Sequence, residues 1–76
     1  MIIEKNQIIT LNNNIEYFVV NTIIYNNEKY ALIININEDN DYLFVKQKRN
    51  QKLIIINDSK TIKDISNLLK DDINLY

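Results

Sequence analysis

The side chains in this sequence that could support acid–base or nucleophilic chemistry are few, because it contains neither histidine nor cysteine. A nucleophile would have to be Ser59, Ser66 or a threonine, with no imidazole to accept its proton. Ser59 follows Asp58 at the start of a predicted helix, where either side chain is expected to cap free backbone N–H groups. Glycine is also absent, so no glycine-rich loop can hold a phosphate. We therefore predict a protein without a catalytic site and without a cofactor.

A second candidate is the acidic segment Glu38-Asp39-Asn40-Asp41, whose oxygen atoms are of the kind that bind calcium. A calcium-binding loop of the EF-hand type that began at Asp39 would need glycine at its sixth position and glutamate at its twelfth. The sequence has Phe44 and Asn50 there. Asp and Asn are ordinary turn residues, so we predict a hairpin loop and no metal site.

The third candidate is a basic segment, residues 46–52, which contains no acidic residue. Its four cations are Lys46, Lys48, Arg49 and Lys52. The rest of the chain has five basic and ten acidic residues, so charge is unevenly distributed. A basic hairpin with Tyr42 and Phe44 nearby as stacking platforms could bind nucleic acid. The alternative is a solvated turn that keeps the hairpin soluble.

These segments lie between stretches rich in β-branched and aromatic residues, which are typical of antiparallel strands. The predicted strands are residues 7–11, 15–25, 29–37, 42–47 and 52–56. Apolar residues then recur at helical spacing, which predicts a helix over 59–70. The residues of its apolar stripe are Ile62, Ile65, Leu68 and Leu69. We expect one α+β domain over residues 1–76, with a five-stranded antiparallel sheet, flat or curled like a barrel, and one C-terminal helix packed on it.

The faces of the sheet suggest a partner. In the third strand the alternation predicts a core face of four residues: Tyr30, Leu32, Ile34 and Ile36. The second strand is apolar on both faces, with Tyr17, Val19 and Ile23 on one and Phe18, Val20 and Ile24 on the other. One helix covers one face, so either the sheet curls over the second set or a partner covers it. The sequence contains no glycine to bend the sheet, which favours a homodimer or protein partner at Tyr17, Val19 and Ile23, opposite the helix.

The composition limits the alternatives. No apolar run approaches the roughly 20 residues of a membrane helix, and the N-terminus does not resemble a secretory signal. We therefore expect a cytoplasmic protein that binds another protein. Glycine and proline are absent, whereas 14 of the 76 residues are asparagine. Because asparagine tolerates left-handed backbone conformations, we expect it at the turns.

The chain resembles the YrzB-like family of short bacterial proteins. The most similar part is 21–32, in which an aliphatic strand leads through Tyr25 and a short turn to Lys29-Tyr30-Ala31-Leu32. Residues 9–13 and 58–69 stand where the family has its first strand and its last helix. Two features differ, because family members are strongly acidic and have a glycine where Asn26-Asn27 stands here. The resemblance implies the fold and a bacterial, cytoplasmic protein, and it implies no activity, because the family has none established.

Overall fold

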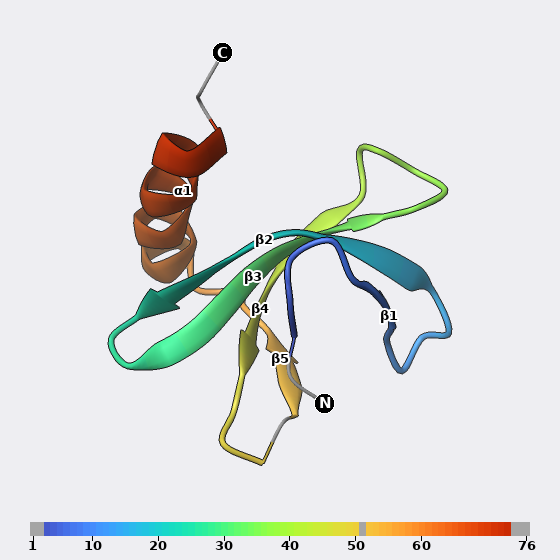
Figure 1. Cartoon of the computed structure of the whole chain (residues 1–76), viewed down its shortest axis with the longest axis horizontal. Helices are drawn as coiled ribbons and strands as arrows, with labels where there is room; N and C mark the ends of the chain where they lie inside the picture. Colours follow the sequence, from blue (N-terminus) through green and yellow to red (C-terminus); the bar gives the residue numbers. More distant parts are fainter. Residues whose placement is uncertain (1–2, 51, 74–76) are drawn as a thin grey trace.

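The computed structural model describes residues 3–50 and 52–73 and shows the predicted α+β fold, with a curled antiparallel sheet and one helix (Figure 1). The five strands stand side by side in chain order. The elements are β1 Ile8–Thr10, β2 Glu16–Tyr25, β3 Glu28–Asn35, β4 Tyr42–Gln47, β5 Leu53–Ile55 and α1 Ser59–Ile73. β3 ends earlier than predicted, because the Asn37 N–H donates to the Asn35 side-chain oxygen (2.8 Å) and begins a turn.

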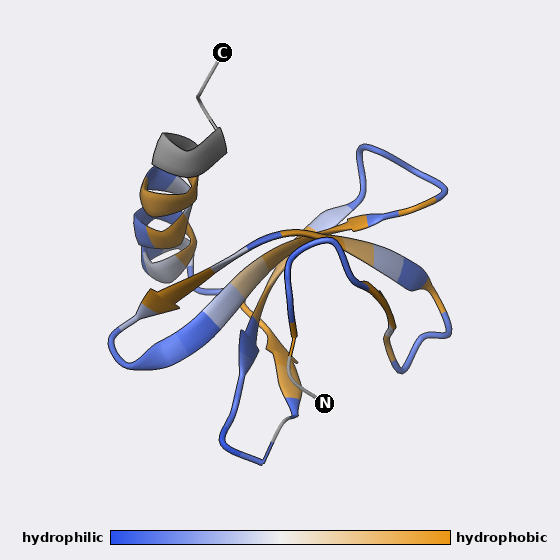
Figure 2. Cartoon of the chain, viewed as in Figure 1, coloured by the Kyte–Doolittle hydropathy of each residue, from blue (hydrophilic) through white to orange (hydrophobic). Residues whose placement is uncertain are grey.

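Asparagine takes the backbone positions that glycine commonly fills. Asn6, Asn14, Asn26 and Asn27 have positive φ angles of 70°, 63°, 52° and 64°. Asn26 and Asn27 form the two-residue turn between β2 and β3, where both central residues need the left-handed region. Figure 2 shows the loops between the strands as mostly hydrophilic and much of the strands as hydrophobic. The expectation that asparagine replaces glycine at turns is confirmed at these positions.

A bulge in β2 changes which side chains share a face. Val19 pairs with Ile33 and Asn21 pairs with Leu32, so Val20 is an extra residue without a direct partner in β3. An inserted residue shifts the period-two alternation by one position. Val19 and Ile23 therefore lie on opposite faces of the sheet. The prediction that Tyr17, Val19 and Ile23 share one face is wrong for this reason.

The concave face of the curled sheet is filled by one buried cluster. Its buried members are Ile3, Ile9, Tyr17, Val19, Ala31, Ile33 and Val45. Ile3, which precedes β1, is 0% exposed, and its N–H donates to Gln47 Oε1 at 3.0 Å. The curl and the N-terminal segment thus bury this cluster, while a groove beside Leu53 and Ile55 stays open on the same face. The predicted core face of β3 is correspondingly wrong in part, because Ala31 and Ile33 on the opposite side are 0% exposed while Ile36 is 42% exposed.

The other face, which we call the helix-bearing face, carries α1 near the β2–β3 turn (Figure 1). Ile65 and Leu69 of the helix pack with Tyr30 in a second buried cluster. The Tyr25 hydroxyl donates to Asp64 Oδ2 at 2.9 Å and ties the helix to β2. Leu68 was predicted to be buried with Leu69, but it is 40% exposed, against 1% for Leu69. Successive helical residues are about 100° apart, so Leu68 is turned toward solvent when Leu69 faces the sheet directly.

Asp58 caps α1, as the sequence predicted for Asp58 or Ser59. Its Oδ2 accepts the Thr61 N–H at 3.0 Å, and its backbone oxygen accepts the Ile62 N–H at 3.0 Å. Ser59 is the first helical residue. Within the described residues, α1 is neither long enough nor apolar enough to cross a membrane.

Candidate interaction surface

The helix-bearing face has a part that α1 does not cover. Four residues are paired in succession across four strands of this part, and we call them the apolar row: Ile8, Phe18, Ile34 and Tyr42. Directly paired residues of antiparallel strands point to the same face. Ile34 stands two residues from Leu32, which packs against the cluster of α1, so the row lies on the helix-bearing face.

The apolar row is exposed to solvent. Ile8 is 57% exposed, Tyr42 56% and Phe18 36%, and Ile34 is half-buried between them. The Tyr42 ring stands edge-on to the Phe44 ring, with 6.3 Å between centroids, and Phe44 packs against the buried cluster of α1. The row therefore adjoins the buried cluster of α1, and its own side chains are accessible to solvent. Contiguous apolar surface of this kind commonly marks a binding site.

A groove connects the row to α1. Its lining includes Tyr42 and Phe44 of β4, Ile62 and Ser66 of α1, and Asn40 of the β3–β4 loop, and its volume is about 570 Å³. One wall of the groove is formed by α1, and the aromatic rings of β4 are accessible from the groove. Side chains of a partner could thus enter between α1 and the loop 36–41.

The predicted interface residues do not form this surface. Tyr17 is 2% exposed and Val19 0%, and both belong to the concave cluster. Ile23 packs beside Tyr30 under α1. Three members of the apolar row, Ile8, Phe18 and Tyr42, are exposed instead, although the alternation in the sequence predicts Phe18 on the other face of the strand. Only the strand register, which aligns Phe18 with Ile8 and Ile34, identifies them as one surface.

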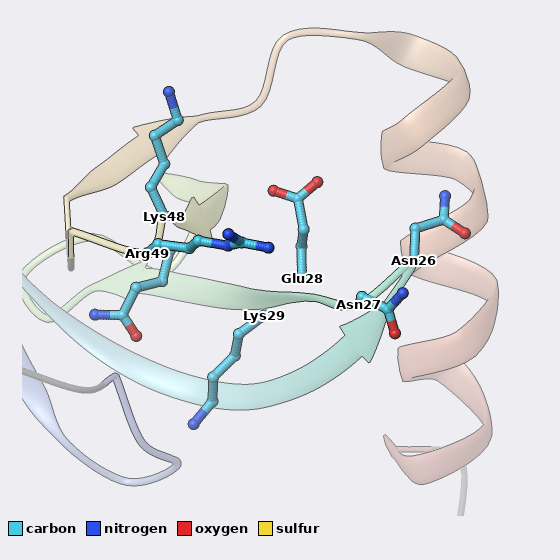
Figure 3. A pocket seen from close by; sticks show the side chains of 7 residues that line it. Asn26, Asn27, Glu28, Lys29, Lys48 and Arg49 are labelled. Carbon is cyan, nitrogen blue, oxygen red and sulfur yellow. The ribbon is translucent and has the colours of Figure 1, made fainter.

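The predicted basic hairpin 46–52 joins β4 to β5 at the opposite end of β4 from Tyr42. Lys46 forms an ion pair with Glu28 (3.1 Å), and the nearby Lys29 pairs with Glu4 (3.4 Å). Lys48 and Arg49 line a cleft of about 540 Å³ together with the β2–β3 turn. Figure 3 shows the Arg49 side chain directed toward Glu28, while Lys48 points away. Lys52 is exposed just before β5.

The aromatic residues proposed as stacking platforms are not at this hairpin. Tyr42 begins β4 and Lys48 follows its end, so about 20 Å of extended strand separates them. Phe44 packs against the cluster of α1. The structure therefore gathers the cations at one end of the sheet and the exposed aromatic rings at the other.

The acidic segment 38–41 lies in the β3–β4 loop, residues 36–41, in agreement with the hairpin prediction. The Asn35 side-chain amide donates to Asp41 Oδ2 at 3.0 Å, and the Asp41 N–H donates to the Glu38 backbone oxygen at 3.0 Å. Among the side chains that the structure describes, no three carboxylates are grouped closely enough to hold a metal ion.

Two aspartates have lowered pKa values. The Thr61 hydroxyl and N–H donate to the Asp58 carboxylate and lower its pKa. The Tyr25 hydroxyl lowers the pKa of Asp64, while Asp64 raises the pKa of Tyr25. Both aspartates act at α1 as structural groups, one as its cap and one as its link to β2.

A scan of the chain against protein-family models found no match, and searches of curated proteins and of solved structures found none either. The resemblance to the YrzB-like family therefore stays a prediction from the sequence.

Proposed function

We propose that this protein is a non-enzymatic interaction module that binds another protein through the apolar row. The observation that carries the proposal is that three members of the row, Ile8, Phe18 and Tyr42, are at least 36% exposed although they adjoin a packed core. Aromatic side chains that are exposed at the centre of a surface are frequent anchors of protein interfaces. The concave face has a groove of its own, of about 670 Å³, beside Leu53 and the 45%-exposed Ile55, but among the described residues it presents no exposed aromatic ring, because Tyr17 is buried there.

Photo-cross-linking in the cells that produce the protein tests this proposal. A benzoyl-phenylalanine placed at Tyr42 is expected to give a discrete cross-linked product. The same amino acid at Ile24, which is 65% exposed at the far end of β2, is the matched control and is expected to give none. The product should disappear when Phe18→Ser is added. Equal products from both positions, or no product from Tyr42, would refute the proposal.

The second candidate function is nucleic-acid binding by the hairpin 46–52, with Lys46, Lys48, Arg49 and Lys52 as the contacts. The exposure of Lys48, Arg49 and Lys52 favours it. The pairing of Lys46 with Glu28 weakens it, because it leaves at most three cations for phosphates. Binding of single-stranded RNA through three phosphates would give a slope of log K against log salt of about −2. A Lys48→Gln, Arg49→Gln variant should then bind more weakly and with a smaller slope, and unchanged binding by this variant would exclude the hairpin.

A further inference from the structure

We propose that the partner segment that docks on the apolar row is a basic amphipathic α-helix of another protein. This inference rests on the proposed function and specifies the chemistry of the partner. It comes from the charge around the row, from the hydrogen bonding of the strands that carry it, and from its length.

The end of the sheet that carries the row is acidic. The sequence has no lysine or arginine between residues 6 and 28, nor between 30 and 45. The carboxylates at this end are Glu16, Glu38, Asp39 and Asp41. Glu16 is on the same face as Phe18, two residues before it, and the other three belong to the loop that connects Ile34 to Tyr42. Among the described side chains, none of the four is in an ion pair. The first turns of α1 add Lys60 and Lys63 against Asp58 and Asp64, so the surroundings of the row stay acidic and attract a segment that carries lysine or arginine beside apolar residues.

The same charges disfavour a second copy of the chain on this surface. A symmetric dimer that paired the two rows would bring the carboxylates of both copies together. A head-to-tail contact between the row and the basic hairpin 46–52 of another copy would not close, and it would give open-ended assemblies. In both arrangements the apparent molecular mass would increase with protein concentration.

The pairing at the centre of the row favours a helix over an added strand, whereas at its two ends β1 and the Tyr42 end of β4 each lack a neighbouring strand on one side. Phe18 and Ile34, at the centre of the row, are paired on both sides, so their strands have no free edge there. A partner reaches them through side chains alone, which is how a helix packs on a sheet. The row crosses three strand spacings, or about 14 Å, and this equals about ten residues of α-helix. The groove beside α1 leaves room for such a segment next to a helix already in place.

Selection from a randomised library of helical peptides tests the inference, with the full chain as bait and counter-selection on a Phe18→Ser, Tyr42→Ser variant. The expected peptides have apolar residues at i, i+3 and i+7 and an excess of lysine and arginine on the flanks. Acidic or uncharged winners would overturn the inference, and so would a selection without winners.

Charge variants then test whether the carboxylates near the apolar row contribute to binding without affecting the fold. A selected peptide, measured by fluorescence anisotropy, should bind Glu38→Lys, Asp39→Lys at least tenfold more weakly than the unaltered chain. Both residues are exposed, so this variant is expected to fold normally. Lys48→Gln at the other end of the sheet is the matched control and should leave the affinity unchanged. Equal affinity for the Glu38→Lys, Asp39→Lys variant and the control would contradict a basic partner.

Sedimentation of the chain alone tests whether a second copy of the chain binds the apolar row. A constant monomer mass is expected, whereas self-association that Phe18→Ser abolishes would assign the row to a second copy. If Tyr42 cross-links a partner in cells and the selection fails, the proposed function stands and the basic helix does not. If Tyr42 cross-links nothing, the proposed function itself fails.

Discussion

The two faces of the sheet differ in how completely the chain covers them. The concave face has a closed cluster, filled from the N-terminal side by Ile3 at 0% exposure. The helix-bearing face has Ile65 and Leu69 packed on Tyr30, and beyond them the exposed apolar row. The bulge at Val20 assigns the two halves of β2 to different clusters, with Tyr17 and Val19 in the concave cluster and Ile23 and Tyr25 beside α1. The buried clusters of both faces stabilise the fold, and the exposed apolar row on the helix-bearing face is the surface that we propose for binding.

The largest effect is expected from truncation in the concave cluster. Ile33 is 0% exposed, so Ile33→Ala should lower the free energy of unfolding by about 2–5 kcal/mol. A domain of this size has little more than that to lose, so much of the variant should be unfolded. The adjacent Ile34→Ala, in the half-buried row, is the matched control and should cost clearly less. Urea denaturation followed by circular dichroism measures both, and equal losses would refute the difference between the faces.

The next effect concerns the helix, in which neighbouring leucines have opposite environments. Leu69→Ala should destabilise the protein by about 2–4 kcal/mol, because it removes a buried side chain from the cluster under α1. Leu68→Ala should cost about 1 kcal/mol or less, because Leu68 is 40% exposed. Thermal unfolding of the two variants compares them directly. Similar midpoints would mean that α1 is rotated relative to its described orientation.

The success and the failure of the sequence predictions have physical causes. Turns at asparagine clusters, alternation in strands and the cap at Asp58 are local patterns, so the elements and the fold class were predictable. The faces of β2 were not, because the bulge at Val20 has no glycine to mark it, and one extra residue reverses every later side chain. The apolar row was missed for a related reason. Phe18 and Tyr42 are 24 positions apart, and only the register through Ile34 brings them together.

A smaller effect is expected at the cap of α1. Asp58→Ala removes the acceptor of the Thr61 N–H and should lower the thermal midpoint, by less than Leu69→Ala does. Asp58→Asn keeps a side-chain oxygen at the N-cap position and should retain most of the stability at neutral pH. If Asp58→Ala and Asp58→Asn melted at the same temperature, the cap would contribute nothing.

The smallest effect is a dependence of stability on acid pH that arises on the helix-bearing face. Hydrogen bonds from Tyr25 and Thr61 lower the pKa values of Asp64 and Asp58 in the folded chain below their ordinary value of 3.8. A carboxyl group with a lowered folded pKa stabilises the protein fully above its unfolded pKa, and that contribution is lost as the pH falls through the folded pKa. Stability should therefore decline below about pH 4.

Tyr25→Phe removes the donor, so the pKa of Asp64, followed by NMR, should rise toward 3.8. The acid loss of stability should then be smaller in Tyr25→Phe, and smaller again when Asp58→Asn is added. Tyr42→Phe, which alters an exposed hydroxyl in the apolar row, should leave the pKa of Asp64 unchanged. An Asp64 pKa that is the same in Tyr25→Phe and in the unaltered chain would show that the hydroxyl does not hold α1 to β2.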